Sequence, residues 1–246
     1  SQMENEVIYS LKDGKFIENN GKLKGYTPSQ ISSLILSKLG GYTSKVKKAV
    51  ITVPAQFADR ARGATLEAAK LSKLDVELIH EPTAAILHYA NMPNVSLNGR
   101  VMVFDLGGGT FDISIAKVIG KKVDIMTSVG DKHLGGQDFD REIIKILDKK
   151  YKKSKGKGLD NKDPVILDIA ERIKKLLSTK EKVSEIIEGP KGPLKIDISR
   201  KEFENSIDTF LEKIKMSMED ALDRAKIKAS NISQILLVGG STRIPI

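Results

Sequence analysis

The chain contains 246 residues, of which 41 are Lys or Arg and 32 are Asp or Glu, giving a net charge of +9. Hydrophobic residues make up 40% and charged residues 30%, a balance typical of a soluble globular protein and not of a disordered or fibrous one, and the length allows one large or two small domains. There is no cysteine and there are three scattered histidines, so disulfides, cysteine-ligated metals and a thiol nucleophile are excluded and a histidine-rich metal site is not indicated.

The first hundred residues predict a hairpin followed by helices and strands in alternation. The hairpin covers residues 5–25, where the pattern alternates weakly around Gly14 and Asn20-Gly21. The elements after it are a helix from Thr27 to Gly40 with Ile31, Leu34, Ile35 and Leu39 on one face, a strand over 48–53 closed by Pro54, a helix over 59–71, a strand over 76–79, and a helix from Thr83 to Tyr89.

A different pattern begins after a linker around residues 92–99. Three strands in a meander are predicted over 100–106, 112–119 and 122–129. They are followed by amphipathic helices over 139–151 and 165–177, a turn over 189–193 between short strands, a long helix from the Ser199 cap to about 228, and a buried strand over 235–238.

Two of these strands run directly into glycine-rich loops that carry a hydroxyl. The strand over 100–106 leads into Gly107-Gly108-Gly109-Thr110, and the strand over 235–238 leads into Gly239-Gly240-Ser241. Consecutive glycines let the backbone reach positive φ and bring several N–H groups close to an anion, and a nearby hydroxyl adds a donor. The alternative is an ordinary hairpin turn. The occurrence of two such loops favours phosphate binding.

Two aspartates flank the first loop. Asp105, at the strand end, stands where a carboxylate would hold the water shell of a phosphate-bound Mg²⁺. Asp112, two residues beyond Thr110, could face the same ion. A hairpin turn does not require three glycines between two aspartates, so this spacing supports a site for magnesium and phosphate.

Lysines cluster in the segment 149–158, which raises the question of nucleic-acid binding. The segment has one aromatic residue, Tyr151, and no arginine to stack on bases or to form forked contacts with them. We therefore predict a solvated loop and no nucleic-acid partner.

The sequence also argues against a membrane protein. No apolar run approaches the roughly 18–20 residues needed to cross a bilayer. The first residues lack a basic stretch followed by an apolar core, so no signal peptide is visible. These features indicate a cytoplasmic protein without a membrane partner, with an organelle as the alternative location.

Five segments resemble signature sequences of the seventy-kilodalton heat-shock protein chaperones, the DnaK-like family, in that family's order and spacing. They are Ile51-Thr52-Val53-Pro54-Ala55, Glu81-Pro82-Thr83-Ala84-Ala85, and residues 105–112, 130–140 and 238–245. The resemblance covers essentially the whole chain. It implies a nucleotide-binding domain of the actin-like, ribonuclease-H-like α/β fold, with two lobes around a cleft for ATP or ADP and Mg²⁺.

The resemblance also implies how the chain divides. Residues 1–98 correspond to the part of lobe one that the chain contains, namely its outer subdomain and two core strands. Residues 99–134 and 208–246 correspond to the core subdomain of lobe two, and residues 135–207 to its outer subdomain.

Site residues follow from the same resemblance, position by position. The catalytic group comprises Glu81, Asp105, Thr110 and Asp112, with Asp105 also placed for the magnesium shell. The nucleotide contacts comprise Gly108, Gly109 and Thr110 at the phosphates, Glu171, Lys174, Lys175 and Ser178 on an adenosine-binding helix, and Gly240, Ser241 and Arg243 on the other side of the nucleoside. Pro54 and Arg62 resemble the pair that relays the nucleotide state to a partner domain.

The chain departs from the family pattern at several positions. Lys175 stands where many members carry an arginine that stacks on adenine, and lysine lacks that planar contact. His80, Lys132 and Gln137 replace the more usual Asn, Thr and Glu. We interpret His80 as a partly buried polar residue beside the cleft and not as a ligand or base.

Residues 1–50 contain neither the family's opening phosphate loop, of the Asp-Leu-Gly-Thr-Thr kind, nor the lysine after it. The family pattern also continues past Ile246. We therefore expect a chain cut at both ends, with lobe one incomplete and ATP hydrolysis by the chain alone slow or absent. Whether the chain is an enzyme in its own right is left open.

Two functions are compatible with these features. The first is the ATP-hydrolysing motor domain of a protein-folding chaperone, which controls the binding of unfolded client polypeptides by a separate domain and works with J-domain co-chaperones and nucleotide exchange factors. The alternative is a divergent nucleotide-binding module without turnover, acting as an exchange factor or co-chaperone. A sugar kinase of the same superfamily is a more distant possibility.

Overall fold

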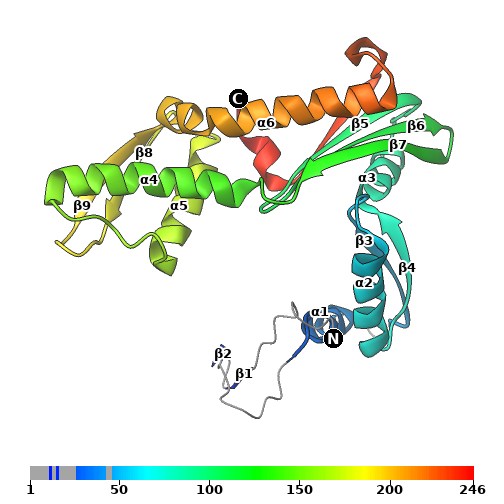
Figure 1. Ribbon diagram of the computed structural model, residues 1–246, viewed down its shortest axis with the longest axis horizontal. Helices are drawn as coiled ribbons and strands as arrows, with labels where there is room; N and C mark the ends of the chain where they lie inside the picture. Colours follow the sequence, from blue (N-terminus) through cyan, green and yellow to red (C-terminus); the bar gives the residue numbers. More distant parts are fainter. Residues whose placement is uncertain (1–10, 13–14, 17–25, 43–45) are drawn as a thin grey trace, which may run out of the picture. The chain divides into compact units, whose positions relative to one another are not determined.

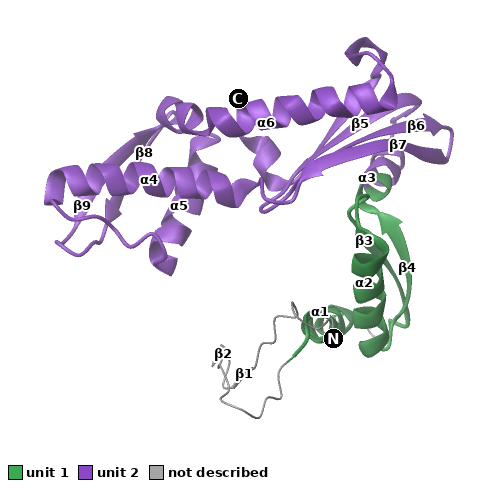
Figure 2. Cartoon of the chain, in the orientation of Figure 1, with its two compact units in different colours: residues 1–84 green, residues 85–246 purple. Residues whose placement is uncertain are grey.

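The computed structural model describes residues 11–12, 15–16, 26–42 and 46–246 (Figure 1). The chain forms two compact units, residues 1–84 and residues 85–246 (Figure 2). Each unit is described by itself below.

Unit 1 contains one parallel pair of strands, a helix that connects them, and helices before and after this pair. Its elements are β1 (Leu11–Lys12), β2 (Lys15–Phe16), α1 (Pro28–Gly40), β3 (Lys48–Val53), α2 (Asp59–Leu71), β4 (Asp75–His80) and the first turn of α3 (Glu81–Ala90). Strands β3 and β4 pair in parallel, with Val53 opposite His80, and α2 connects them. Strands β1 and β2 pair antiparallel, and the rest of the hairpin predicted over 5–25 lies outside the described residues.

Helix α1 begins as the sequence predicts but keeps much of its apolar face in solvent. The Thr27 side chain accepts a hydrogen bond from the Gln30 N–H, and the Gln30 side chain accepts one from the Thr27 N–H, which together form a capping box. Among the described residues, Leu34, Ile35 and Leu39 are each about half exposed. The helix therefore owes its position to its cap and to its contacts with α2.

Unit 2 is built on a four-stranded sheet in the order β10-β5-β6-β7. The strands are β5 (Gly99–Leu106), β6 (Phe111–Ile119), β7 (Lys122–Asp131) and β10 (Gln234–Val238). Strand β10 runs parallel to β5, and the other neighbours are antiparallel. This is the predicted meander with the last strand added at its edge.

Successive side chains of β5 point to opposite faces of the sheet and contribute to two different cores, one on each face. Met102 and Leu106 join the larger core, which includes α6 (Arg200–Ala225), whereas Val101 and Val103 join a smaller core with Ile86 of α3. The sheet is therefore covered on both faces, by α6 on one and by the second half of α3 on the other (Figure 1).

The larger core continues into a group of helices and strands at the other end of unit 2. They are α4 (Gly136–Lys155), α5 (Pro164–Leu177), β8 (Lys182–Ile187) and β9 (Leu194–Ser199), and short 3-10 helices cover Ala229–Asn231 and Gly240–Arg243. Strands β8 and β9 form the predicted hairpin. Side chains from α4, α5, β8, β9 and α6 share one continuous cluster, so the sheet and this group are packed through α6.

Three predicted boundaries are wrong. Helix α3 begins at Glu81, with Pro82 in its first turn, where proline removes no intrahelical hydrogen bond. Helix α6 ends at Ala225, followed by Lys226 with φ of 53°. Helix α4 extends to Lys155 and ends at Gly156, with φ of +74°, so most of the lysine cluster lies on the last helical turns and not in a loop.

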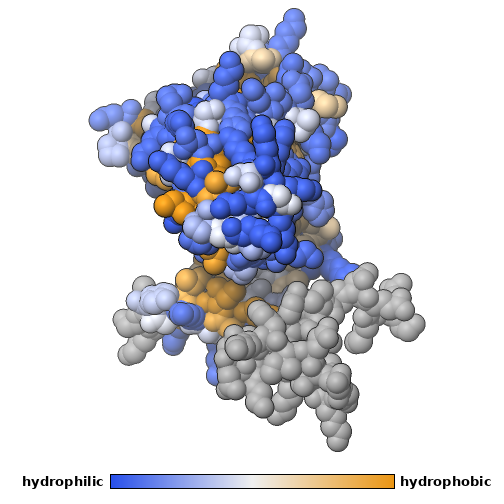
Figure 3. Space-filling model, turned by 90° about the vertical axis from the view of Figure 1, so that its left-hand side faces the viewer, coloured by the Kyte–Doolittle hydropathy of each residue, from blue (hydrophilic) through white to orange (hydrophobic). Residues whose placement is uncertain are grey.

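The physical reason is that lysine is a good helix former and its charge is favourable at a helix C-terminus. The lysines are nevertheless solvated as predicted, since Lys149, Lys152, Lys153 and Lys157 are exposed. The corresponding end of unit 2 presents a mainly hydrophilic surface (Figure 3).

The buried Tyr151 fixes the β8–β9 turn to α4. Its hydroxyl donates a hydrogen bond of 2.8 Å to the Gly192 carbonyl and accepts one of 3.0 Å from the Lys191 N–H. A Cβ on Gly189 would lie 2.5 Å from the tyrosine ring, so the turn backbone rests directly on the ring.

Replacing Tyr151 with Phe should lower the free energy of unfolding by about 1–3 kcal/mol, because two turn groups lose their partner while the ring remains. Urea denaturation measures this change. Lys191→Ala is the control, since only the backbone of Lys191 takes part. Equal stability of the Tyr151→Phe variant and the parent would contradict the assignment.

Candidate functional site

The first glycine loop is a hairpin turn between β5 and β6, closed by a 3.0 Å hydrogen bond from the Gly107 N–H to the Thr110 carbonyl. None of Gly107, Gly108 and Gly109 has positive φ, so the expectation that these glycines supply left-handed backbone is wrong. Close approach to this loop requires glycine at position 135 instead. A Cβ on Gly135 would lie 2.6 Å from Gly109 N and 2.7 Å from the Gly108 carbonyl carbon.

The N-terminus of α4 determines which way the loop's peptide groups face. Gly136 N–H donates to the Gly107 carbonyl at 2.9 Å, and Gln137 N–H donates to the Gly108 carbonyl at 2.8 Å. In a trans peptide the N–H points opposite to the C=O of the same unit. The N–H groups of Gly108 and Gly109 are therefore directed away from α4, on residues that are exposed. With the exposed Thr110 hydroxyl they form a set of donors suited to an anion.

The two predicted carboxylates lie on one face of the sheet, beside this loop. Asp105 and Asp112 are direct cross-strand partners, and such partners project to the same side. Both residues are partly buried, and burial raises the pKa of the Asp105 carboxyl. A divalent cation beside the Asp105 carboxylate would offset the cost of burying its charge.

The second glycine loop lies against the first because β10 runs parallel to β5, with Val238 opposite Asp105. Gly239 has φ of +88°, and a Cβ there would collide with the Leu106 carbonyl oxygen. The buried Ser241 donates a 3.0 Å hydrogen bond to the Gly107 carbonyl, so its hydroxyl is directed into the protein. Gly240 and Arg243 are exposed on the outside of this loop.

The predicted adenosine-binding helix is α5, and its polar residues divide between two environments. Glu171 and Lys175 are exposed and form an ion pair of 2.8 Å, and the hydrogen bond from Lys175 lowers the pKa of the Glu171 carboxyl. Ser178 lies at the C-terminal cap, with its Oγ 3.5 Å from the Lys174 carbonyl. Lys174 is buried and faces α4.

The remaining predicted site residues belong to unit 1. Pro54 directly follows β3 and is partly buried, and Glu81 begins α3. Arg62 of α2 places its Nη1 3.1 Å from Nε2 of His80, at the end of β4. His80 is therefore a partly buried partner of an arginine, as expected for a partly buried polar residue.

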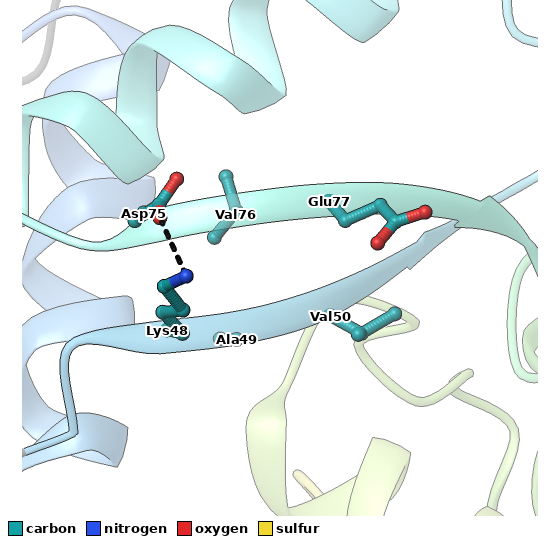
Figure 4. A pocket seen from close by; sticks show the side chains of 6 residues that line it. All are labelled: Lys48, Ala49, Val50, Asp75, Val76 and Glu77. Atoms are coloured by element: carbon teal, nitrogen blue, oxygen red, sulfur yellow. Dashed lines mark ion pairs between the residues drawn. The ribbon is translucent and has the colours of Figure 1, made fainter.

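Unit 1 also carries a hollow of about 380 Å³ on the exposed side of β3 and β4, lined by Lys48, Ala49, Val50, Asp75, Val76 and Glu77 (Figure 4). Its ion pair joins Lys48 to Asp75 at 3.9 Å, and both side chains are mostly exposed, so the pair adds little stability. None of the predicted site residues lines this hollow.

Within the part of the chain that the structure describes, no group of three His, Asp or Glu side chains could hold a metal ion. A Mg²⁺ ion at Asp105 and Asp112 would therefore have to share its coordination with phosphate oxygens and water, as this ion commonly does. Over the same described residues, no helix is long and apolar enough to cross a membrane.

Three residues that hold this site together were not assigned a role from the sequence: Gly135, Gly136 and Asp140. The signal was present in the run Gly135-Gly136, since two glycines at a helix start indicate close backbone approach. Asp140 gave no such signal, because its partner Lys174 is 34 positions away in the sequence.

Comparison with known proteins identifies the family of the chain. The Hsp70 protein family model matches residues 1–246. The chain belongs to the Hsp70 family. It is 40% identical to the "Chaperone protein DnaK" of Mycoplasmopsis pulmonis (strain UAB CTIP) over 248 aligned positions, which cover 94% of this chain and 41% of that protein. The chain thus spans about two fifths of the length of this curated relative.

Membership of the Hsp70 family confirms the predicted fold class, the actin-like ATPase fold. The mixed sheet of unit 2, with helices on both faces, is consistent with it. The donor set also fits the ligands of the family, since Gly108, Gly109 and Thr110 offer N–H and hydroxyl donors to phosphate and Asp105 offers a carboxylate to Mg²⁺.

Gly239→Ala should lower the free energy of unfolding by at least about 1–3 kcal/mol, because alanine is strained at φ of +88° and its Cβ would collide with the Leu106 carbonyl. The matched control is Gly240→Ala, where a Cβ meets no atom within 4 Å. Chemical denaturation of both variants tests the difference. Similar losses in the two would contradict the close packing of the loops.

Asp105→Asn should stabilise the nucleotide-free protein at pH 7, because burial disfavours the ionised carboxylate and raises its pKa in the folded state. As the pH falls through this raised pKa towards the usual value of 3.8, the folded state takes up the proton first and the penalty disappears. The gain from Asn should therefore shrink with acidification. Denaturation at several pH values measures it, and a loss of stability at pH 7 would contradict the account.

Proposed function

We propose that this chain is the nucleotide-binding part of an Hsp70 chaperone and that unit 2 binds ADP or ATP with Mg²⁺. The observation that carries the proposal is the packing of two glycine loops and the start of α4 around the ends of β5 and β10. This packing turns the Gly108 and Gly109 N–H groups outward beside Asp105 and Asp112.

In this proposal each group has a distinct task. The backbone N–H groups of Gly108 and Gly109 and the Thr110 hydroxyl hold the terminal phosphates, and Asp105 orders the water shell of the magnesium ion. The bound Mg²⁺ supplies charge stabilisation at the phosphates. Asp112 and Glu81 are the further carboxylates proposed to act in hydrolysis, with Glu81 near the attacking water.

The nucleoside contacts are proposed from residues of two elements. Glu171, Lys175, Gly240 and Arg243 are exposed, whereas Ser178 is partly buried and Ser241 is buried. Glu171, Lys175 and Ser178 along α5 contact one side of the nucleoside, and Gly240, Ser241 and Arg243 contact the other. The resemblance also assigns to this group Lys174, which is buried in the described structure.

For the whole protein we propose ATP hydrolysis that controls the binding of unfolded polypeptides by a separate domain, with Pro54 and Arg62 relaying the nucleotide state. J-domain co-chaperones and nucleotide exchange factors are the proposed partners. The relative's name, chaperone protein DnaK, supports this choice.

The alternative is a nucleotide-binding module without turnover that acts as an exchange factor or co-chaperone. It is favoured by Lys175 in place of a stacking arginine. Single-turnover hydrolysis of ATP by the full-length protein distinguishes the two functions, since a rate that Asp105→Asn abolishes supports the motor domain.

Calorimetry with the 246-residue chain tests nucleotide binding directly. Mg²⁺-ADP should bind, and magnesium pyrophosphate should bind more weakly because it lacks the contacts along α5. Asp105→Asn should remove the gain in ADP affinity that Mg²⁺ provides. Equal affinity for ADP and pyrophosphate would overturn the proposed nucleoside contacts, and binding of neither would overturn the proposed function.

Lys175→Arg should tighten ADP binding by about 0.5–1 kcal/mol, because a planar guanidinium can stack on adenine whereas an ammonium cannot. Lys175 is two-thirds exposed, so the larger side chain has room, and Arg can still pair with Glu171. Calorimetry measures the change. Arg172→Lys on the same helix is the control, because Arg172 pairs with Glu185 of β8. An unchanged ADP affinity in Lys175→Arg would show that residue 175 does not contact the base.

A further inference from the structure

Arg200 is the first residue of α6, but its side chain reaches the end of another helix. Its Nε–H donates a 2.7 Å hydrogen bond to the carbonyl of Leu177, the last residue of α5. The Arg200 side chain is 19% exposed and Leu177 is fully buried, so this contact lies mostly away from solvent. Two residues that are 23 positions apart are thereby joined at the point where α5 ends.

This contact satisfies a carbonyl that the helix itself cannot satisfy. The last four carbonyls of an α-helix have no partner within the helix, and a buried carbonyl without a partner is costly. At the end of α5 the carbonyls of Lys175 and Leu176 accept N–H groups of the following turn at 2.9 to 3.3 Å. The next carbonyl, that of Leu177, is bound by Arg200. Arg200 therefore caps α5 although it belongs to α6.

The position of the guanidinium group is unfavourable for α6 and favourable for α5. A cation in the first turn of a helix is disfavoured by the helix dipole, whereas a cation at a helix C-terminus is favoured. Nη1 of Arg200 also pairs with Glu181 at 2.6 Å, but the Glu181 side chain is 84% exposed, so this ion pair adds little. The hydrogen bond to Leu177 is then the contact that accounts for an arginine at this position.

The peptide unit that Arg200 binds also carries the backbone N–H of Ser178. The Leu177 carbonyl and the Ser178 N–H belong to one planar unit, so fixing the first fixes the direction of the second. Ser178 is partly buried at the C-terminal cap of α5. It is the last of the nucleoside contacts proposed along this helix, so its position bears directly on the nucleoside site.

We propose that Arg200 is a positioning residue: by binding the Leu177 carbonyl it holds Ser178 and the last turn of α5 in place to bind the nucleoside. This inference rests on the proposed nucleotide site. The phosphate loop is held by different groups, the Gly136 N–H and the Ser241 hydroxyl. The effect of Arg200 is therefore on binding of the nucleoside and not on binding of the phosphates.

Two substitutions separate the hydrogen bond from the rest of the side chain, since Gln and Met both match the arginine chain as far as Nε. In Arg200→Gln the side-chain amide nitrogen can take the place of Nε and still donate to the Leu177 carbonyl, whereas Arg200→Met has no donor there. Both variants lose the pair with Glu181. A difference between the two variants therefore measures the hydrogen bond to Leu177.

Amide hydrogen exchange in the nucleotide-free protein tests the positioning role independently of nucleotide binding. In Arg200→Met, exchange of the Ser178 and Thr179 amides should accelerate at least about tenfold, because the end of α5 loses its cap. In Arg200→Gln the rates should stay within about threefold of the parent, because the cap is kept. Glu181→Gln is a further control, since it removes the exposed ion pair alone. Equal rates in Arg200→Met and Arg200→Gln would overturn the proposal.

A measurement on the parent chain serves if Arg200→Met is too unstable to study. A contact that supports ligand binding is itself supported by the ligand, because coupling between two sites is reciprocal. Saturating adenosine should therefore slow the exchange of the Arg200 Nε–H with water at least about threefold. An unchanged rate in the presence of bound adenosine would overturn the proposal.

Calorimetry with adenosine and with magnesium pyrophosphate completes the test. Arg200→Met should bind adenosine about tenfold more weakly and pyrophosphate within about twofold of the parent, and Arg200→Gln should bind both as the parent does. Equal losses for both ligands in Arg200→Met, or adenosine binding as in the parent, would overturn the proposal. If the parent chain binds neither ligand, the proposed function fails, while the exchange rates still decide whether Arg200 holds the end of α5.

Discussion

The carbonyl group of Gly107 is the point on which the candidate site depends. It accepts hydrogen bonds from the Gly136 N–H and from the Ser241 hydroxyl, and so joins the β5–β6 turn, the start of α4 and the loop after β10. These three segments are separated by about thirty and by more than a hundred positions in the sequence. These two hydrogen bonds fix the carbonyl of the peptide unit between Gly107 and Gly108. They therefore also fix the direction of the Gly108 N–H, which points to the opposite side of that unit. A rigid donor is what an anion site requires.

Glycine serves a different purpose in each of these segments. Gly239 supplies left-handed backbone and close approach to Leu106, whereas Gly135 and Gly136 supply close approach alone. Gly108 and Gly109 have nothing within 4 Å of a Cβ, so packing within the chain does not require glycine at either position. Open space on the outer side of the loop is consistent with a ligand that approaches the backbone there.

Much of the fold could be predicted from the sequence, because two of its signals are local. These are the periodicity of hydrophobic residues and the glycines and prolines that end helices and strands. The strands over 100–106 and 235–238 and the helix from Ser199 are examples, as is the hydrogen-bonded cap at Thr27. The candidate site could be located for the same reason, since Asp105, Thr110 and Asp112 lie within eight consecutive positions. What could not be predicted depends on contacts between distant segments. The inward direction of Lys174 and Ser241, and the ion pair of Lys174 with Asp140, arise from the packing of α4, α5 and the last loop.

The account's central claim, that these loops form one phosphate site, is tested most directly by an NMR titration of the chain labelled with [¹⁵N]glycine. Adding Mg²⁺-ADP should shift the amide signals of Gly108, Gly109 and Gly240 together and at the same nucleotide concentration. Gly156 and Gly192, which lie in turns outside the site, should not shift. Shifts at Gly156 and Gly192 with none at Gly108 and Gly109 would contradict the account.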